Sequence, residues 1–350
     1  MKTTTKVLGL AAFAALAGGY MPKSAQAAET ILFNCFFPPQ HYVCRRWLPH
    51  MAKEIAAATD GRVKMRIPPK SLAAPPDQYD AVVNGVADGA LQFNAFIANK
   101  VPGIQVGQLP FIGIQNAEAP GVALWRTYQK FFASKNEYGP VELLTVYASN
   151  GAEFYSMTDK PIESIADISG RKMWVLPGIV ANLVKRTGSP VVVGPAVQML
   201  EVISKGVVDG YVGVPISSVH NFKLTSYTKS ITLLDRKVFT PTFSFFVNKK
   251  KWAKISKKDQ AAIKAVTGEK MARWFGQDQD KEFVKGREKV LSAGVKEVQG
   301  SASFLGQLDA LGRPAYDAWK KRVAAMGVDG DAVIEYYQAQ IAAEMKKIKK

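Results

Sequence analysis

The side chains that most often carry out enzyme chemistry are few and scattered in this sequence of 350 residues. The three histidines, His41, His50 and His220, lack the spacing of a zinc site. Ser169 and Lys172 match the spacing of a serine–lysine pair, but no SDN or KTG motif follows them. The sequence has no HExxH, GxSxG, CxxC, GxGxxG or P-loop motif, and its carboxylates form no evident acid–base pair. We therefore expect a binding protein with no enzyme activity, no cofactor and no metal.

The two cysteines, Cys35 and Cys44, lie close together in the sequence. A cysteine pair in an exported protein often forms a disulfide. Spacing alone does not show whether the geometry of a bridge is met. A disulfide and two free buried thiols are both compatible with the sequence.

The first 27 residues predict a secretory signal peptide. They combine a basic start, an apolar run from Val7 to about Ala17, and an A-x-A cleavage motif that ends at Ala27. The apolar run is short for a membrane span, which makes a permanent anchor the weaker alternative. We expect the mature chain to begin at Ala28 and to be soluble in the periplasm.

Composition and charge favour a globular protein without a nucleic-acid partner. Hydrophobic residues make up 47% and charged residues 21% of the chain, which are ordinary values. The net charge of +17 is compatible with nucleic acid, an anionic surface or an acidic partner. The lysines are scattered, however, and no basic stretch alternates with stacking aromatic residues. The charge therefore predicts a solvated basic surface.

The order of the predicted elements indicates an α/β fold of two lobes. Near the start and again in the middle, strand-like and helix-like segments alternate, and this order favours a sheet with helices on its faces. The first series runs through residues 29–37, 41–61, 62–69, 76–89 and 90–96, and the second through 171–177, 178–188, 189–195, 196–210 and 211–215. Ligands of such sheets bind at the carboxyl ends of strands, where Asn34, Phe36, Phe37 and Asn94 lie.

Two similar phrases suggest that the lobes share one plan. "VNGVADGALQF" at 83–93 resembles "SKGVVDGYVGV" at 204–214, and each reads as a helix end, a turn and a strand. A further strand is predicted within 239–252, and a long helix from Ser256 to about Ser292. Ser256 and Asp259 have the spacing of a capping box at its start, and the helix is long enough to brace both lobes.

These patterns predict the division of the chain. We expect a signal peptide at 1–27, lobe I at 28–152 with about 239–275, lobe II at 153–238 with about 276–330, and a C-terminal helix at 331–350.

Taken in order, several segments resemble the solute-binding proteins of TRAP (tripartite ATP-independent periplasmic) transporters of the C4-dicarboxylate-binding type. They are "FFPPQHYVCRRW", "VNGVADGALQF", "GQLPFI", "KPIESIADISGRKMWVLPG", "LEVISKGVVDG" and "FVNKKKWAKISKKDQAAI". The resemblance covers most of the predicted mature chain. It implies a two-lobed periplasmic binding protein fold with hinge strands and a long lobe-spanning helix. It also implies closure around one small solute and delivery of that solute to a membrane permease without ATP.

The sequence departs from this family at two positions. Members usually carry one arginine in a "G-x-R" stretch and another in "K-x-R-x-P", and both arginines hold the carboxylate of an organic acid. Here Glu153 of "GAE" and Trp174 of "KMWVLP" stand at those positions, with one extra residue before the proline. If the two segments correspond, a bound carboxylate would face a like charge.

The replacements suggest a cationic solute, such as ethanolamine or a related amino alcohol. Glu153 would accept a charge-assisted hydrogen bond from the ammonium group, and the ring of Trp174 would add a cation–π contact contributing roughly 0.5–2 kcal/mol. We expect further contacts from aromatic side chains, from amides that bind a hydroxyl, and from one histidine of the cleft: Phe36, Phe37, Tyr211, Phe243, Asn34, Asn94 and His41.

Other interpretations remain open at this point. Glu153 pairs with Arg171 or Lys172 in one of them, Trp174 packs between the lobes in another, and the aromatic residues belong to the core in a third. The solute is then a neutral polar compound or an organic acid held by other donors. An exported enzyme with an unrecognised site is the alternative from another class. We expect a monomer whose partners are the solute and a TRAP-type permease.

Overall fold

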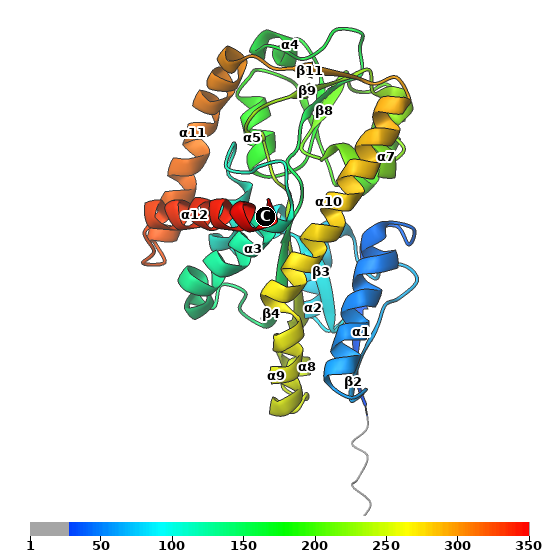
Figure 1. Cartoon of the computed structure of the whole chain (residues 1–350), viewed down its shortest axis with the longest axis vertical. Helices are drawn as coiled ribbons and strands as arrows, with labels where there is room; N and C mark the ends of the chain where they lie inside the picture. Colours follow the sequence, from blue (N-terminus) through cyan, green and yellow to red (C-terminus); the bar gives the residue numbers. More distant parts are fainter. Residues whose placement is uncertain (1–27, 350) are drawn as a thin grey trace, which may run out of the picture.

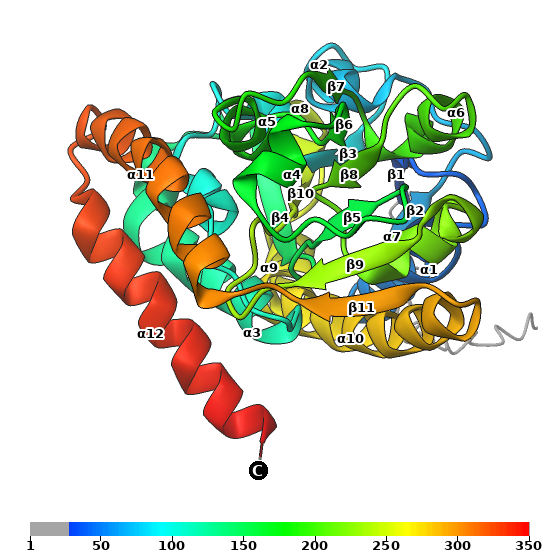
Figure 2. The same cartoon turned by 90° about the horizontal axis from the view of Figure 1, so that it is seen from above.

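The computed structural model describes residues 28–349, so the predicted signal peptide lies outside the described residues. It confirms an α/β fold built on two separate mixed sheets, one in each lobe (Figures 1 and 2). The described helices include none that is both long enough and apolar enough to cross a membrane.

The sheet of lobe I has five strands in the order β2-β1-β3-β10-β4. Strand β1 is parallel to β2 and β3, whereas β10 is antiparallel to both β3 and β4. The strands are β1 Glu29–Asn34, β2 Val63–Arg66, β3 Gly89–Phe93, β4 Val141–Ala148 and β10 Thr242–Asn248. Because β10 comes late in the chain, lobe I is completed only after the chain has returned from lobe II.

The sheet of lobe II has six strands in the order β11-β9-β5-β8-β6-β7. Strand β5 is antiparallel to its neighbours β8 and β9, and the other described pairs are parallel. The strands are β5 Phe154–Ser156, β6 Met173–Val175, β7 Val191–Val193, β8 Gly210–Val212, β9 Ser230–Leu233 and β11 Lys296–Gln299.

Short helices join the strands of both sheets. In lobe I these are α1 Leu48–Ala58, α2 Gln78–Val83, α3 Glu118–Thr127 and α8 Lys249–Trp252, and in lobe II α4 Ile165–Ser169, α5 Ile179–Lys185, α6 Met199–Ser204 and α7 Ile216–Asn221. The predicted helix at 41–61 begins with a wider π-helical turn, Val43–Trp47. Pro49 is the second residue after this turn and has no amide hydrogen for the regular ladder.

The two similar phrases have the same structural role. Asp88 precedes β3, and its carboxylate accepts a hydrogen bond from the amide of Leu32 at 2.8 Å. Asp209 precedes β8, and its carboxylate accepts one from the amide of Lys172 at 2.9 Å. Each aspartate therefore ties the turn before a strand to the neighbouring parallel segment.

Two extended segments connect the lobes, and the helices Gly268–Ser292 and Ala302–Ala324 contact both lobes. The segments are 149–153, after β4, and 234–241, before β10. They pair with each other, because the amide of Ser149 donates to Pro241 and the amide of Ala152 donates to Phe239, both at 2.8 Å. Paired crossing strands of this kind form the hinge between the two lobes.

The predicted long helix is bent. It consists of α9 Lys257–Val266 and α10 Gly268–Ser292, and Figure 1 shows α10 running from one lobe to the other. As predicted, the Ser256 hydroxyl caps the start by accepting from the amide of Asp259. Two glycines let α10 approach both lobes: a Cβ on Gly276 would lie 2.3 Å from Glu118, and one on Gly286 would lie 2.6 Å from Ser217.

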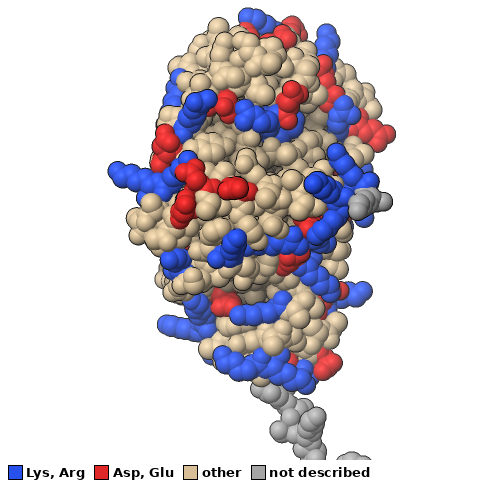
Figure 3. Space-filling model, turned by 60° about the vertical axis from the view of Figure 1, so that its left-hand side comes forward, with Lys and Arg blue, Asp and Glu red and all other residues tan. Residues whose placement is uncertain are grey.

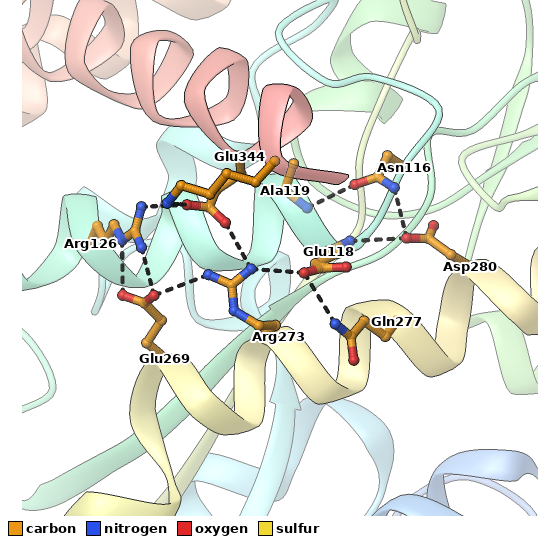
Figure 4. Close-up of polar contacts among 10 residues, drawn as sticks. Asn116, Glu118, Ala119, Arg126, Glu269, Arg273, Gln277, Asp280 and Glu344 are labelled. Carbon is orange, nitrogen blue, oxygen red and sulfur yellow. Dashed lines mark hydrogen bonds and ion pairs between the residues drawn. The ribbon is translucent and has the colours of Figure 1, made fainter. Parts of the chain in front are cut away.

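The chain ends in two helices, α11 Ala302–Ala324 and α12 Gly330–Ile348. An ion-pair network around the buried Glu344 fixes α12 to α3 and α10 (Figure 4). Glu344 of α12 pairs with Arg126 of α3 at 2.8 Å and with Arg273 of α10 at 2.7 Å. Burial opposes ionisation of Glu344, but ion pairs with Lys347, Arg273 and Arg126 lower its pKa to about 2.

Asp280 of α10 links the helix to the start of α3, as Figure 4 shows, and also to the hinge. Its carboxylate accepts from the amide of Ala117, at the start of α3, and from the side chain of Asn150, in a crossing segment, at 2.8 and 2.6 Å. On the face shown in Figure 3, basic side chains are spread over the molecule and interspersed with acidic ones.

Candidate functional site

A cavity of about 50 Å³ lies between the lobes, next to the hinge. A single water needs roughly 10–15 Å³ on the same scale, so the cavity has room for a small molecule. Most of its wall is apolar. Lobe I and the crossing segments contribute mainly Phe36, Phe37, Phe93, Phe96, Tyr147, Pro241 and Phe243, and lobe II contributes Leu176, Pro195, Ala196, Val214, Pro215, Ser218 and Phe222.

A disulfide-closed loop forms one wall of the cavity. Cys35 and Cys44 are bridged, with Cα atoms 6.1 Å apart, which is within the ordinary range. The loop that they close begins at the end of β1 and carries Phe36, Phe37, His41, Tyr42 and Val43, all of which line the cavity. The bridge therefore restrains a segment that supplies several of the aromatic side chains of the wall.

The aromatic rings of this wall are stacked. The ring of Phe37 lies between those of Phe36 and His41, at centroid distances of 4.4 and 4.2 Å. Phe243 of β10 lies 6.0 Å from Phe37. From lobe II, Phe222 stacks on His41 at 5.7 Å. The rings thus continue across the boundary between the lobes, and a planar aromatic ligand would meet faces and edges of matching size.

The polar groups of the cavity are neutral. Among the described residues that line it there is no lysine, arginine, aspartate or glutamate. Burial, together with the charge of Arg46, lowers the pKa of His41 to about 3, so that its ring is uncharged at neutral pH. The remaining polar side chains carry hydroxyls: Tyr42, Tyr147, Ser149 and Ser218. Burial raises the pKa of both tyrosines.

Four of the predicted ligand contacts line the cavity, namely Phe36, Phe37, His41 and Phe243. The loop and β10 bring these residues together from distant parts of the sequence. Glu153, Trp174, Asn34, Asn94 and Tyr211 are not among the lining residues, and each has a local explanation in the fold.

Glu153 has an ion-pair partner of its own. Its Oε1 lies 2.5 Å from the Nζ of Lys237, and both side chains are buried. Lys237 also donates to the carbonyl of Leu234 at 2.7 Å. Burial raises the pKa of Glu153 to about 7, although Lys237 opposes this shift. The pair joins the two crossing segments, and it replaces the Arg171 or Lys172 partners considered from the sequence.

Trp174 and Tyr211 lie inside the sheet of lobe II. Trp174 of β6 is fully buried and faces Tyr211 of β8 in the strand register. The hydroxyl of Tyr211 is 2.6 Å from that of Thr228, and its ring stacks on Tyr155 with centroids 4.5 Å apart. Both side chains therefore pack in the core of the lobe, and neither offers a ring face to the cavity.

The two asparagines hold backbone and side-chain groups of lobe I. Asn34 donates to Gln78 at 2.7 Å and accepts from the amide of Leu72 at 3.0 Å. Asn94 donates to Thr242 at 3.0 Å and accepts from Ser244 at 2.6 Å. These bonds occupy the amide groups that the sequence had suggested for a ligand hydroxyl.

The sequence analysis did not single out the hydroxyl groups of the cavity. Tyr147 is in β4, Ser149 in the crossing segment that follows, and Ser218 in α7. The apolar run 141–148 marks a buried strand, but only the pairing of β4 with β10 shows that Tyr147 lies beside Phe243 at the site.

Comparisons with known proteins place the chain in a defined group. A family model described as "Bacterial extracellular solute-binding protein, family 7" matches residues 36–322. The chain is 35% identical over 324 residues to the outer membrane transporter protein TsaT of Comamonas testosteroni, covering 92% of this chain and 95% of that protein. It is 26% identical over 295 residues to a solute-binding protein of Chromohalobacter salexigens, covering 80% and 81%.

Two solved structures are especially similar. A TRAP periplasmic solute-binding protein from Bordetella bronchiseptica, with bound (R)- and (S)-mandelate, has a TM-score of 0.84 and 28% identity, covering 90% of this chain and 99% of that one. A marine metagenome TRAP solute-binding protein specific for aromatic acid ligands, from an unidentified microbe, contains 3-hydroxybenzoate. It has a TM-score of 0.81 and 26% identity, covering 91% and 99%.

Proposed function

The chain belongs to family 7 of the bacterial extracellular solute-binding proteins, and we propose that its solute is a small aromatic compound with one oxygen-bearing polar group. As a member of this family it is a non-enzymatic periplasmic receptor, which binds a small molecule for the membrane permease of a TRAP transporter. Aromatic carboxylic acids are the first candidates for the solute.

The stacked aromatic cavity carries this proposal. Phe36, Phe37 and Phe243 from lobe I and Phe222 from lobe II surround a small apolar space. A benzene ring that buries about 100 Å² there gains roughly 2.5 kcal/mol from the removal of apolar surface from water. Ring stacking adds a smaller contribution. A short aliphatic amino alcohol has little apolar surface to bury and no ring to stack, so it gains little from these two contributions.

The similar structures support an acid as the polar group. The Bordetella bronchiseptica protein holds mandelate, and the marine metagenome protein holds 3-hydroxybenzoate. Both ligands combine one benzene ring with a carboxylate. A neutral aromatic solute, such as an amide or alcohol, is the second candidate because the described lining of the cavity carries no formal charge.

The two side chains that suggested an amine solute, Glu153 and Trp174, do not line the cavity. An ammonium group in a closed cavity needs a free acidic or strongly accepting partner. Glu153 is engaged by Lys237, and the ring of Trp174 packs within lobe II. We therefore use ethanolamine as a negative control.

A calorimetric titration panel tests the proposal. The panel contains benzoate, mandelate and 3-hydroxybenzoate, the neutral isostere benzamide, the aliphatic acid succinate, and ethanolamine. We expect at least one benzene-containing compound to bind in the micromolar range or tighter, and succinate and ethanolamine to bind far more weakly. Tight binding of ethanolamine or succinate, without binding of any aromatic compound, would refute the aromatic assignment.

A further inference from the structure

We propose that the hydroxyl of Tyr147 donates the hydrogen bond that positions the oxygen-bearing group of the solute, and that this donor takes the place of a cationic side chain. The inference rests on the proposed aromatic solute. It assigns the selection of the polar group to one residue of β4.

Tyr147 is buried, with 3% of its surface exposed, and lines the cavity. Its ring is held by neighbours on both sides: Trp47 meets it edge-on with centroids 4.7 Å apart, and Phe243 stacks on it at 5.7 Å. Because these contacts leave the ring little freedom, the position of the hydroxyl is set before a ligand arrives.

The hydroxyl of Tyr147 makes no hydrogen bond of ordinary geometry with a described residue, although the hydroxyls of Tyr42 and Ser149 lie close enough to interact with it. A buried hydroxyl that has left water without finding a partner is costly. Tyr42 and Ser149 contribute the neighbouring hydroxyls of the cavity. A solute that brings an oxygen acceptor to this position would satisfy the orphaned donor, whereas an apolar solute would not.

The other polar groups are compatible with an acceptor on the solute. The amide of Val43 points to Nδ1 of His41 at 3.4 Å. In a neutral imidazole whose Nδ1 accepts, the proton is on Nε2, and that nitrogen is then a donor. Neutral donors that are fixed in place stabilise an anionic oxygen without a counter-ion. The site therefore selects its solute by donor geometry.

A second tyrosine provides a matched control. Tyr337 of α12 is fully buried, and its hydroxyl also lacks a partner among the described residues. It packs in the core of lobe I and is not part of the cavity lining. Tyr337→Phe and Tyr147→Phe thus delete the same atom from equally buried rings, and only one of them faces the solute.

Titration calorimetry on the parent protein, Tyr147→Phe and Tyr337→Phe tests the inference, with the tightest acid of the panel, its amide and toluene. We expect Tyr147→Phe to weaken the acid by about tenfold to a hundredfold, the range for a hydrogen bond to a charged group. The amide should lose about threefold to tenfold. Toluene should bind the parent and the variant equally, and Tyr337→Phe should leave all three affinities unchanged.

Three results would overturn the inference. In the first, Tyr147→Phe binds the acid as tightly as the parent does. In the second, it weakens toluene as much as the acid, which indicates a structural role. In the third, Tyr337→Phe weakens binding of the acid as much as Tyr147→Phe does. If the parent binds none of the aromatic compounds, the proposed function itself fails, and that result differs from the other three because it precedes any substitution.

Discussion

At the scale of single residues, the partner of a side chain decides what it does. Glu153 and Trp174 suggested a cationic solute because of their types and positions, but neither sequence segment reveals the neighbours of these residues. The partner of Glu153 is Lys237, which lies 84 residues away on the other crossing segment. Both side chains are buried, so this carboxylate already has a charged partner within the protein. The cavity itself carries neutral groups, of which His41 is the one expected to change charge as the solution is acidified.

His41 predicts a loss of stability in mild acid. Its pKa is about 3 in the folded protein and about 6.5 when the chain is unfolded. The unfolded state therefore binds more protons between these values, so stability falls as the pH drops below about 6.5. From pH 7 to 5 the free energy of unfolding should fall by about 2 kcal/mol through this residue. Urea unfolding of the parent and of His41→Gln at both pH values measures the effect.

His220→Gln is the control for this prediction, because His220 is half-buried in α7 and lies outside the cavity lining. The pH dependence should shrink in His41→Gln and change less in His220→Gln. An equal pH dependence in the parent and in His41→Gln would show that the histidine of the cavity is not held neutral by burial.

At the scale of elements, periodicity and turn residues predicted most of the strands and the long helix. The predicted strands at 29–37, 62–69 and 171–177 contain β1, β2 and β6, and those at 90–96 and 211–215 overlap β3 and β8, each of which begins one residue earlier. The long helix ends at Ser292 as predicted. Its bend was missed, because it lies at Gly268, which adopts a positive φ of 56° and packs against Trp125. The sequence around Gly268 does not reveal this tertiary contact.

The cavity was predicted less well than the elements. The aromatic residues at the end of β1 were identified, because they follow a strand directly. Tyr147, Ser149 and Phe222 were missed, since their position depends on the pairing of β4 with β10 and on the packing of α7 against the other lobe. Such non-local pairings leave no periodic signal in the chain.

The disulfide loop yields a prediction at this scale. Replacing both Cys35 and Cys44 by alanine frees the loop that carries Phe36, Phe37 and His41. Closing a loop of this length stabilises a protein by about 2–3 kcal/mol through the unfolded state. The double variant should therefore unfold more easily, and it should bind aromatic solutes more weakly because the wall of the cavity is no longer restrained.

Chemical denaturation and calorimetry of the double variant measure both effects. Dithiothreitol treatment of the parent is the matched control, because it opens the same bridge without a change of sequence. Retention of the full solute affinity in both samples would show that the bridge does not position the cavity wall.

At the scale of the whole molecule, the architecture explains why the cavity lies where it does. Each lobe completes its own sheet, and the paired crossing segments and α10 are shared between them (Figure 1). A solute in this cavity contacts residues of both lobes near the hinge. The ion pairs of Glu344 and the hydrogen bonds of Asp280 brace α10 outside the cavity (Figure 4), so that the aromatic wall is formed on a rigid support.

The solute that the protein binds in its own environment tests the central claim most directly. The exported protein is purified from the periplasm without refolding, exposed to a small-molecule extract of the host culture, and washed. Mass spectrometry then identifies the compound released on denaturation, with a variant carrying Phe37→Asp and Phe243→Asp as the control for non-specific carryover. We predict a compound with one benzene ring and an oxygen-bearing polar group, enriched over the control. Enrichment of an aliphatic amine such as ethanolamine, or of an aliphatic acid, would contradict the account.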